Sequence, residues 1–213
     1  MFKSGKFVSN HIKNPDGSTV DEERVTPHGV ELTIDKIFET KTYGVLNDKD
    51  YDRPERKEAE KIDPEVYDTF VHSYRHITQN ITEDDKVEQN NEEDESGTYK
   101  INTLLGSNEN IDVDSTYYAL HPDRYVIKYN EEIEIPNDHI GFVFPRSRVV
   151  RSNANVTTGV WDAGYKGEGE GGLVVNAPLF VEESMPIAVI IMCRANTHNV
   201  YDGSHNNENI DEN

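Results

Sequence analysis

Short apolar segments with regular alternation fill the C-terminal half of the chain and predict β-strands. At 133–135 and 140–144, apolar residues recur at every second position on either side of a Pro136-Asn137-Asp138 turn. Runs at 173–175 and 180–181 follow, each bounded by turn residues. The unbroken run 186–192 has the length of a strand buried on both faces. Short strands separated by frequent turns predict an all-β, sandwich-like or barrel-like domain.

The N-terminal part adds a candidate pair of strands at 29–34 and 36–39, where apolar and polar residues again alternate. Between about 47 and 115 the chain becomes rich in Asp, Glu, Asn and Lys, which predicts an acidic insertion. Within it, Asp63 and Pro64 are suited to begin an amphipathic helix that continues to Ile81, and the rest resembles a disordered loop. We expect one domain, 1–213, with its core at 1–46 and 116–200 and a tail at 201–213.

Composition limits the classes of partner. The formal net charge is −20, with 41 acidic against 21 basic residues, which argues against binding to nucleic acids or anionic membranes. Two explanations of the charge stay open: a strongly solvated acidic surface, or a device for binding a basic partner. The chain has one cysteine, which excludes an internal disulfide, and no apolar run long enough for a membrane span or secretory signal. We therefore expect a cytoplasmic protein.

Candidate chemistry concentrates in residues 139–168. The stretch 139–161 contains three arginines and no acid, and Arg146-Ser147-Arg148 follows an apolar strand and a proline. Guanidinium, hydroxyl and backbone N–H groups at one strand end suit phosphate oxygens. Asp162 and Tyr165 follow on a glycine-containing turn, where a carboxylate can activate water. The structural alternatives are a turn-capping role for Asp162 and a core position for Tyr165.

Other site classes are less well supported. The eight histidines show no convincing set of metal ligands; His72 and His76 share a helix spacing, but no third ligand accompanies them. The zinc deaminase signature needs several cysteines and is absent.

Taken in order, these segments resemble the motifs of the dUTPase and dCTP deaminase superfamily, and most closely its archaeal dUTPase branch. The resemblance covers about 1–45 and 116–210 and leaves the acidic insertion outside. Its most specific part is 158–167, Thr-Gly-Val-Trp-Asp-Ala-Gly-Tyr-Lys-Gly, close behind Pro145-Arg146-Ser147-Arg148. Residues 29–33 and 186–191 look like the first and fourth motifs, and 169–175 and 201–204 also resemble the archaeal branch.

The resemblance implies a β-clip, jelly-roll-like subunit in a homotrimer, with sites between subunits that hydrolyse dUTP to dUMP and pyrophosphate with Mg²⁺. It places the triphosphate on Arg146 and Ser147, with Arg148 as an added charge. Asp162 would hold the 3′-hydroxyl and orient the attacking water, and Tyr165 would pack on the sugar and disfavour ribose. The uracil would be read by backbone groups of Thr158, Gly159 and Val160. Glu31 would touch the Mg²⁺ hydration shell through water.

The chain departs from the family pattern in ways that keep two alternatives open. Glu31 stands where Asp is usual, Arg148 replaces a small residue, and Pro186 and Val189 replace the arginine and glutamine of the fourth motif. The glycine-rich closing arm of ordinary dUTPases is also missing. One alternative is dCTP deamination, which requires a glutamate about ten residues after the aspartate; position 172 is glycine, although Glu168 and Glu170 lie nearby. The other is a non-catalytic nucleotide-binding or regulatory protein on the same fold.

Overall fold

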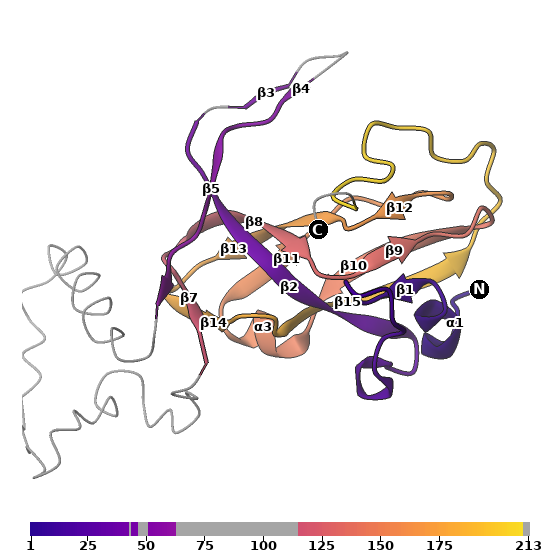
Figure 1. Cartoon of the computed structure of the whole chain (residues 1–213), viewed down its shortest axis with the longest axis horizontal. Helices are drawn as coiled ribbons and strands as arrows, with labels where there is room; N and C mark the ends of the chain where they lie inside the picture. Colours follow the sequence, from indigo (N-terminus) through magenta and orange to yellow (C-terminus); the bar gives the residue numbers. More distant parts are fainter. Residues whose placement is uncertain (43, 47–50, 63–114, 211–213) are drawn as a thin grey trace, which may run out of the picture.

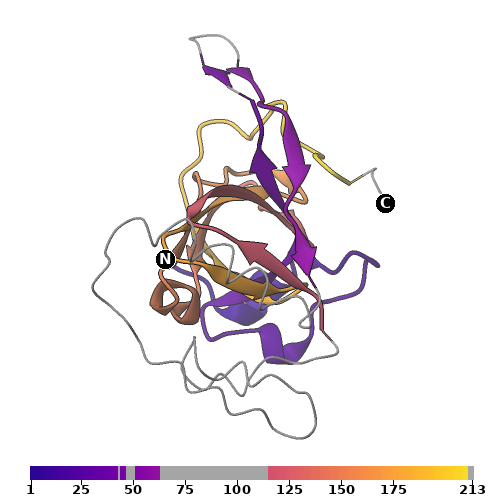
Figure 2. The same ribbon diagram turned by 90° about the vertical axis from the view of Figure 1, so that its left-hand side faces the viewer.

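The fold is a near-closed antiparallel β-barrel, seen end-on as a ring of strands in Figure 2. The computed structural model describes residues 1–42, 44–46, 51–62 and 115–210. The predicted helix at 64–81, with His72 and His76, lies outside these residues. The main sheet has the strand order β10-β15-β2-β8-β13-β11. Its strands are β2 (Gly29–Thr40), β8 (Asp123–Tyr129), β10 (His139–Pro145), β11 (Ala154–Thr157), β13 (Glu170–Val175) and β15 (Pro186–Arg194). The all-β, barrel-like expectation is confirmed.

Smaller elements surround the barrel (Figure 1). One short sheet joins β1 (Ile12–Lys13), β9 (Glu132–Glu134) and β12 (Lys166–Gly167), and another joins β14 (Leu179–Glu182), β7 (Tyr117–Leu120) and β6 (Lys61–Ile62). The strands β3 (Val45–Leu46) and β4 (Tyr51–Asp52) form a projecting arm, while β5 (Arg56–Glu58) pairs with β2. The helices are α1 (Gly5–Ser9), η1 (Glu22–Arg24) and α3 (Ser147–Arg151). Pairing with core strands therefore continues into the segment expected to be an insertion.

A single strand replaces the expected N-terminal pair. β2 runs unbroken through both predicted segments, and a register shift between Ile34 and Lys36 marks a bulge at Asp35. Before the bulge β2 pairs with β15, and from Ile34 onward it pairs with β8. The prediction of two strands was wrong because a bulge bends a strand and interrupts its alternation without ending it.

The ring is closed beside the candidate site. Trp161, which follows β11, bridges Gly141 of β10, with backbone hydrogen bonds of 2.8 and 3.0 Å between the two residues. The interior is filled by large apolar and aromatic side chains that are fully buried, among them Leu32, Tyr118, Ile127, Tyr129 and Leu173. This core supports the strands from which the candidate site residues project.

The strand β10 presents its larger apolar residues outward. His139, Gly141 and Val143 are buried, whereas Ile140 and Phe142 are half-buried and Phe144 is 52% exposed. In register with them on β15 are Cys193, Ile191 and Val189, none of them buried. We call these six residues the outer face of β10 and β15. The expectation that 186–192 is buried on both faces is therefore not met within one chain.

No helix among the described residues has the length and apolar character needed to cross a membrane.

Candidate functional site

The arginine cluster lies where β10 ends and α3 begins. Arg146 occupies the position before the helix, held by a backbone hydrogen bond of 3.0 Å from its N–H to the carbonyl of Ile187. Its Nη2 lies 2.7 Å from Oε1 of Glu31. The sequence segment around Arg146 contains no acid, but the sheet supplies one, because Glu31 on β2 is in register with Val189 and Val189 with Phe144. The sequence did not reveal this acid, because its position depends on the register between strands that are distant in the chain.

A second guanidinium stands beside the first. Arg148 donates from Nη2 to the carbonyl of Pro186 at 3.2 Å. Burial and the neighbouring Arg146 charge lower the pKa of Arg148, against the opposing effect of Glu31 and Glu182. Ser147 is exposed, and its hydroxyl has no hydrogen bond within the described part of the chain. The two guanidiniums repel each other although Glu31 pairs with Arg146, and an anion added beside the free hydroxyl would relieve the remaining repulsion.

The loop after β11 carries the residues expected to bind the nucleoside. The hydroxyl of Thr158 accepts a hydrogen bond from Trp161 Nε1 at 3.2 Å and donates to the carbonyl of Gly159 at 2.7 Å. Val160 is 54% exposed. The backbone N–H groups of 158–160 donate no hydrogen bond to the residues that the structure describes. They are thus available to a ligand.

Asp162 is exposed, and its carboxylate makes no hydrogen bond or ion pair in the described ranges. Its carbonyl accepts from the N–H of Tyr165 at 3.1 Å, and Gly164 between them has φ +84°, a left-handed value that favours glycine. The turn therefore fixes the Asp162 backbone and leaves the carboxylate free. The side-chain capping alternative is not what the structure shows.

Tyr165 is a buried residue whose hydroxyl is already engaged. Its ring packs edge-on against Trp161 and Tyr201, at centroid distances of 5.1 and 6.0 Å. The hydroxyl donates to Oε1 of Glu208 at 2.9 Å. Burial, followed by the nearby Glu208 charge, raises the pKa of Tyr165 and keeps the hydroxyl protonated. The structure thus gives Tyr165 a core position, and any contact with a sugar would use the ring.

The arginine and aspartate do not meet within one chain. Trp161 forms an antiparallel bridge with Gly141 of β10. Because the two segments run in opposite directions, Asp162 lies opposite Ile140, one residue further from the Arg146 end of β10. Six residues of extended strand then separate it from Arg146, roughly 20 Å at 3.3 Å per residue. In Figure 1, α3 lies at the lower edge of the barrel and β12 at the upper edge. A cleft shared by the two groups therefore needs a second chain.

Deamination would require a glutamate near position 172, and the two glutamates nearest to it in sequence, Glu168 and Glu170, are held in ion pairs. Oε2 of Glu168 lies 2.9 Å from Nζ of the buried Lys128, which also pairs with Asp35 at 3.1 Å. Glu170 accepts two hydrogen bonds from Nη1 of Arg56, at 2.8 and 2.9 Å. At position 172 a Cβ atom would stand 2.5 Å from Oγ1 of Thr157, so a glutamate cannot be accommodated there without a local shift.

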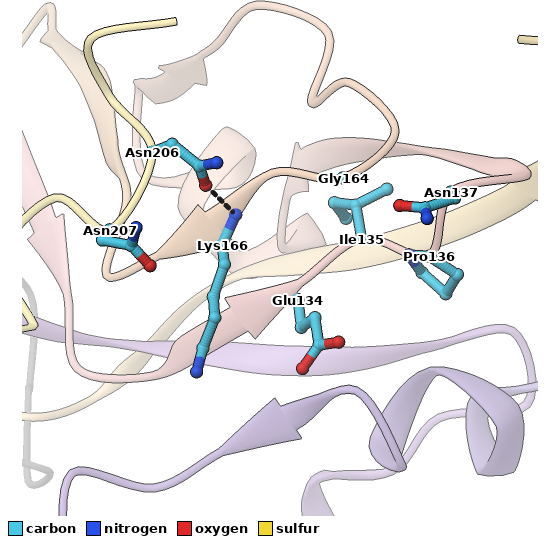
Figure 3. A pocket seen from close by; sticks show the side chains of 8 residues that line it. All are labelled: Glu134, Ile135, Pro136, Asn137, Gly164, Lys166, Asn206 and Asn207. Carbon is cyan, nitrogen blue, oxygen red and sulfur yellow. Dashed lines mark hydrogen bonds between the residues drawn. The ribbon is translucent and has the colours of Figure 1, made fainter. Parts of the chain in front are cut away.

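A polar cavity of about 400 Å³ adjoins the turn after Asp162. Figure 3 shows Lys166, Asn206 and Asn207 on one side of it and Pro136 and Asn137 on the other. Lys166 Nζ pairs with Glu132 at 3.2 Å. The position of the tail beside this turn could not be predicted, because nothing in residues 201–210 marks a partner 40 residues away.

Protein ligands alone do not form a metal centre in the described ranges, where no three His, Cys, Asp or Glu side chains converge. Glu31 is the carboxylate paired with Arg146, through one of its two oxygens. Mg²⁺ keeps several waters and binds through one or two carboxylates plus substrate phosphates. The residues therefore fit an ion that a nucleotide would bring with it.

Comparison with known proteins supplies a family and relatives. A family model described as dCTP deaminase-like matches residues 2–195. A probable deoxyuridine 5′-triphosphate nucleotidohydrolase of Halobacterium salinarum is 27% identical over 211 residues, which cover 99% of this chain and 97% of that protein. One of Aeropyrum pernix is 35% identical over 95 residues, 43% of this chain and 60% of that protein.

Among solved structures, a 2′-deoxycytidine 5′-triphosphate deaminase from Agrobacterium tumefaciens is similar with a TM-score of 0.48 and 12% identity. The match covers 90% of this chain and 47% of that one, so this chain spans about half its length.

Proposed function

This chain belongs to the dCTP deaminase-like family, and we propose that within it the chain hydrolyses dUTP to dUMP and pyrophosphate. The observation that carries this choice is the state of the acids behind Asp162. Deamination needs a glutamate that can move protons at the base, but Glu168 and Glu170 are held by Lys128 and Arg56. For phosphate hydrolysis the acid needed is an exposed carboxylate that can orient water, and Asp162 fits that requirement.

In the proposed reaction, Arg146 and Ser147 bind the triphosphate and Arg148 adds a second guanidinium. Arg148 is bonded to the carbonyl of Pro186, so it brings a cation to the strand end where the family's fourth motif usually has its arginine. These groups, with backbone N–H donors, stabilise the charge that develops on the phosphate oxygens. The altered fourth motif is therefore compatible with catalysis.

The Asp162 carboxylate accepts a hydrogen bond from the 3′-hydroxyl of the sugar and orients the water that attacks the α-phosphorus. The free N–H groups of 158–160 suit the carbonyl oxygens of uracil, and the Tyr165 ring packs beneath the sugar. The base is thereby read by the backbone. A Mg²⁺ ion bound with the nucleotide would neutralise phosphate charge, and Glu31 would touch its hydration shell through water.

The proposed assembly is a homotrimer with each site between subunits. Two observations support association. Within one chain, Arg146 follows the end of β10, whereas Asp162 lies beside the start of that strand. The outer face of β10 and β15 presents six apolar residues of which none is fully buried within one chain, with Phe144 52% exposed and stacked on Phe142 at 6.5 Å. Burial of this face between copies would bring one chain's Arg146 toward another's Asp162.

The test is product analysis with dUTP, dCTP and dTTP in the presence of Mg²⁺. We expect dUMP and pyrophosphate from dUTP and no ammonia from dCTP. Ammonia release would assign the chain to the deaminases instead. Tight binding of dUTP in calorimetry without any product would assign it to non-catalytic nucleotide-binding proteins.

A further inference from the structure

The last described residues wrap around the loop that carries Asp162. We call residues 201–210 the C-terminal strap and residues 162–168 the carboxylate loop. The strap donates from Tyr201 N to the carbonyl of Ala163 at 2.6 Å and from Asn207 N to that of Lys166 at 2.7 Å. In return, Lys166 N donates to Oδ1 of Asn206 at 3.0 Å, the bond drawn in Figure 3. The strap thus pairs with most of the loop.

Glu208 is the centre of this contact. Its backbone carbonyl accepts a hydrogen bond from Glu168 N at 3.1 Å. Glu208 also forms an isolated parallel β-bridge with Gly167. Its carboxylate accepts from the Tyr165 hydroxyl through Oε1 at 2.9 Å and contacts His205 Nδ1 through Oε2 at 3.0 Å. Arg53 Nη2, at the base of the arm, lies 3.6 Å from the same Oε2. One carboxylate therefore joins the arm, the strap and the carboxylate loop.

The carboxylate loop is also held at other positions. Backbone hydrogen bonds of 2.9 and 2.8 Å join its Gly164 and Tyr165 to Ile135, and its Glu168 pairs with Lys128. Trp161 anchors it on one side through Gly141, and β12, which follows Asp162, pairs with β9 over only two residues. The strap occupies the other edge of β12. The fit is close, because a Cβ atom at Gly167 would lie 2.8 Å from the Tyr165 hydroxyl and 3.1 Å from the carbonyl of Glu208. Since the Asp162 side chain has no partner of its own in the described ranges, its direction follows the loop.

We propose that Glu208 is a positioning residue, which holds Tyr165 and the carboxylate loop so that Asp162 faces the reacting water. The proposal rests on the proposed function of Asp162. In this role Glu208 does not contact the substrate, because it acts through its hydrogen bond with the buried Tyr165 hydroxyl. A displaced catalytic group slows the chemical step more than it weakens binding by distant phosphate contacts.

The test compares Glu208→Ala and Glu208→Gln with the parent, and uses Glu23→Ala, an exposed glutamate in η1, as the matched control. In Glu208→Ala we expect kcat for pyrophosphate release from dUTP to fall roughly tenfold with little change in KM. Glu208→Gln keeps an acceptor oxygen for Tyr165 and should recover most of that loss. Backbone amides of Lys166 and Asn207 should exchange hydrogen faster in Glu208→Ala only. If Glu208→Ala does not fold, Tyr165→Phe removes the same hydrogen bond and should show the same loss of kcat.

A Glu208→Ala or Tyr165→Phe variant with the parent's kcat overturns the proposal, whatever its amide exchange. Failure of the proposed function is recognised separately, because the parent itself would then release no pyrophosphate. In that case Glu208 has no reacting group to position, while the exchange measurement still decides whether Glu208 holds the loop.

Discussion

Arg146 and Glu31, which lie 115 positions apart in the sequence, form an ion pair with 2.7 Å between Nη2 and Oε1. The pair preorganises a guanidinium at the end of β10 and also neutralises it while no phosphate is bound. Replacement of Arg146 by alanine should therefore remove a charge-assisted phosphate contact of about 1.5–3 kcal/mol. We expect kcat/KM for dUTP to fall roughly ten- to a hundredfold.

The matched control is Arg151→Ala, which removes the same charge from the exposed end of α3. Steady-state assays of pyrophosphate release should show near-parental activity for it. Equal activity of Arg146→Ala and the parent would refute the phosphate assignment.

The Lys128 ion pairs give a prediction for stability. Replacement of Glu168 by glutamine leaves the buried Lys128 ammonium with Asp35 as its remaining carboxylate. The free energy of unfolding should fall by about 1–3 kcal/mol, less than if the cation lost every partner. For a chain of this size Tm should drop roughly 2–4 °C per kcal/mol, measurable by calorimetry. An unchanged Tm would show that the pair contributes nothing.

The outer face of β10 and β15 predicts an effect on assembly. A charge at position 144, introduced by Phe144→Asp, should prevent burial of this face, so light scattering should show a monomer where the proposed trimer is expected for the parent. Leu46→Asp on the arm, where the leucine is 86% exposed, is the control and should leave the mass unchanged. If Phe144→Asp retains the parent's mass, association does not use this face.

His11 predicts how stability depends on pH. Burial lowers the pKa of His11 below its ordinary value of 6.5; the nearby Glu134 opposes this and His139 adds to it. The folded state thus takes up this proton less readily than the unfolded chain, so stability is complete above pH 6.5 and falls as the pH drops below it. Between pH 7.5 and 5.5, Tm of His11→Gln should fall less than that of the parent. His198→Gln, at an exposed histidine, should fall as the parent does.

The sequence predicted strands well and their partners poorly. Period-two alternation located β9 and β10, because a strand's side chains alternate whatever it packs against, and continuous apolar runs located β13 and β15. Alternation did not indicate which face of β10 is buried: the bulky residues were the obvious core candidates, yet Gly141 and Val143 face inward. That choice depends on Trp161 and Ile135, which fill the space beside Gly141.

The candidate site shows the same division. The local motif at 145–148 and the turn at 162–165 could be found because each is continuous in the chain. Glu31 beside Arg146 and Glu208 beside Tyr165 could not, since both contacts depend on register and on the path of the tail. Pairing between elements distant in sequence is where residue patterns carry least information.

The distance between Arg146 and Asp162 on one chain predicts how two inactive variants should behave when they are mixed. If each site takes its arginine from one subunit and its aspartate from another, Arg146→Ala and Asp162→Asn are defects in different halves of the same site. Each variant alone should lose most activity, Asp162→Asn by a factor on the order of 10²–10⁴. Refolded together, they should complement one another, because mixed oligomers would contain some sites with both native residues. Such recovery, absent when either variant is refolded alone, would show that residues of two subunits form each site.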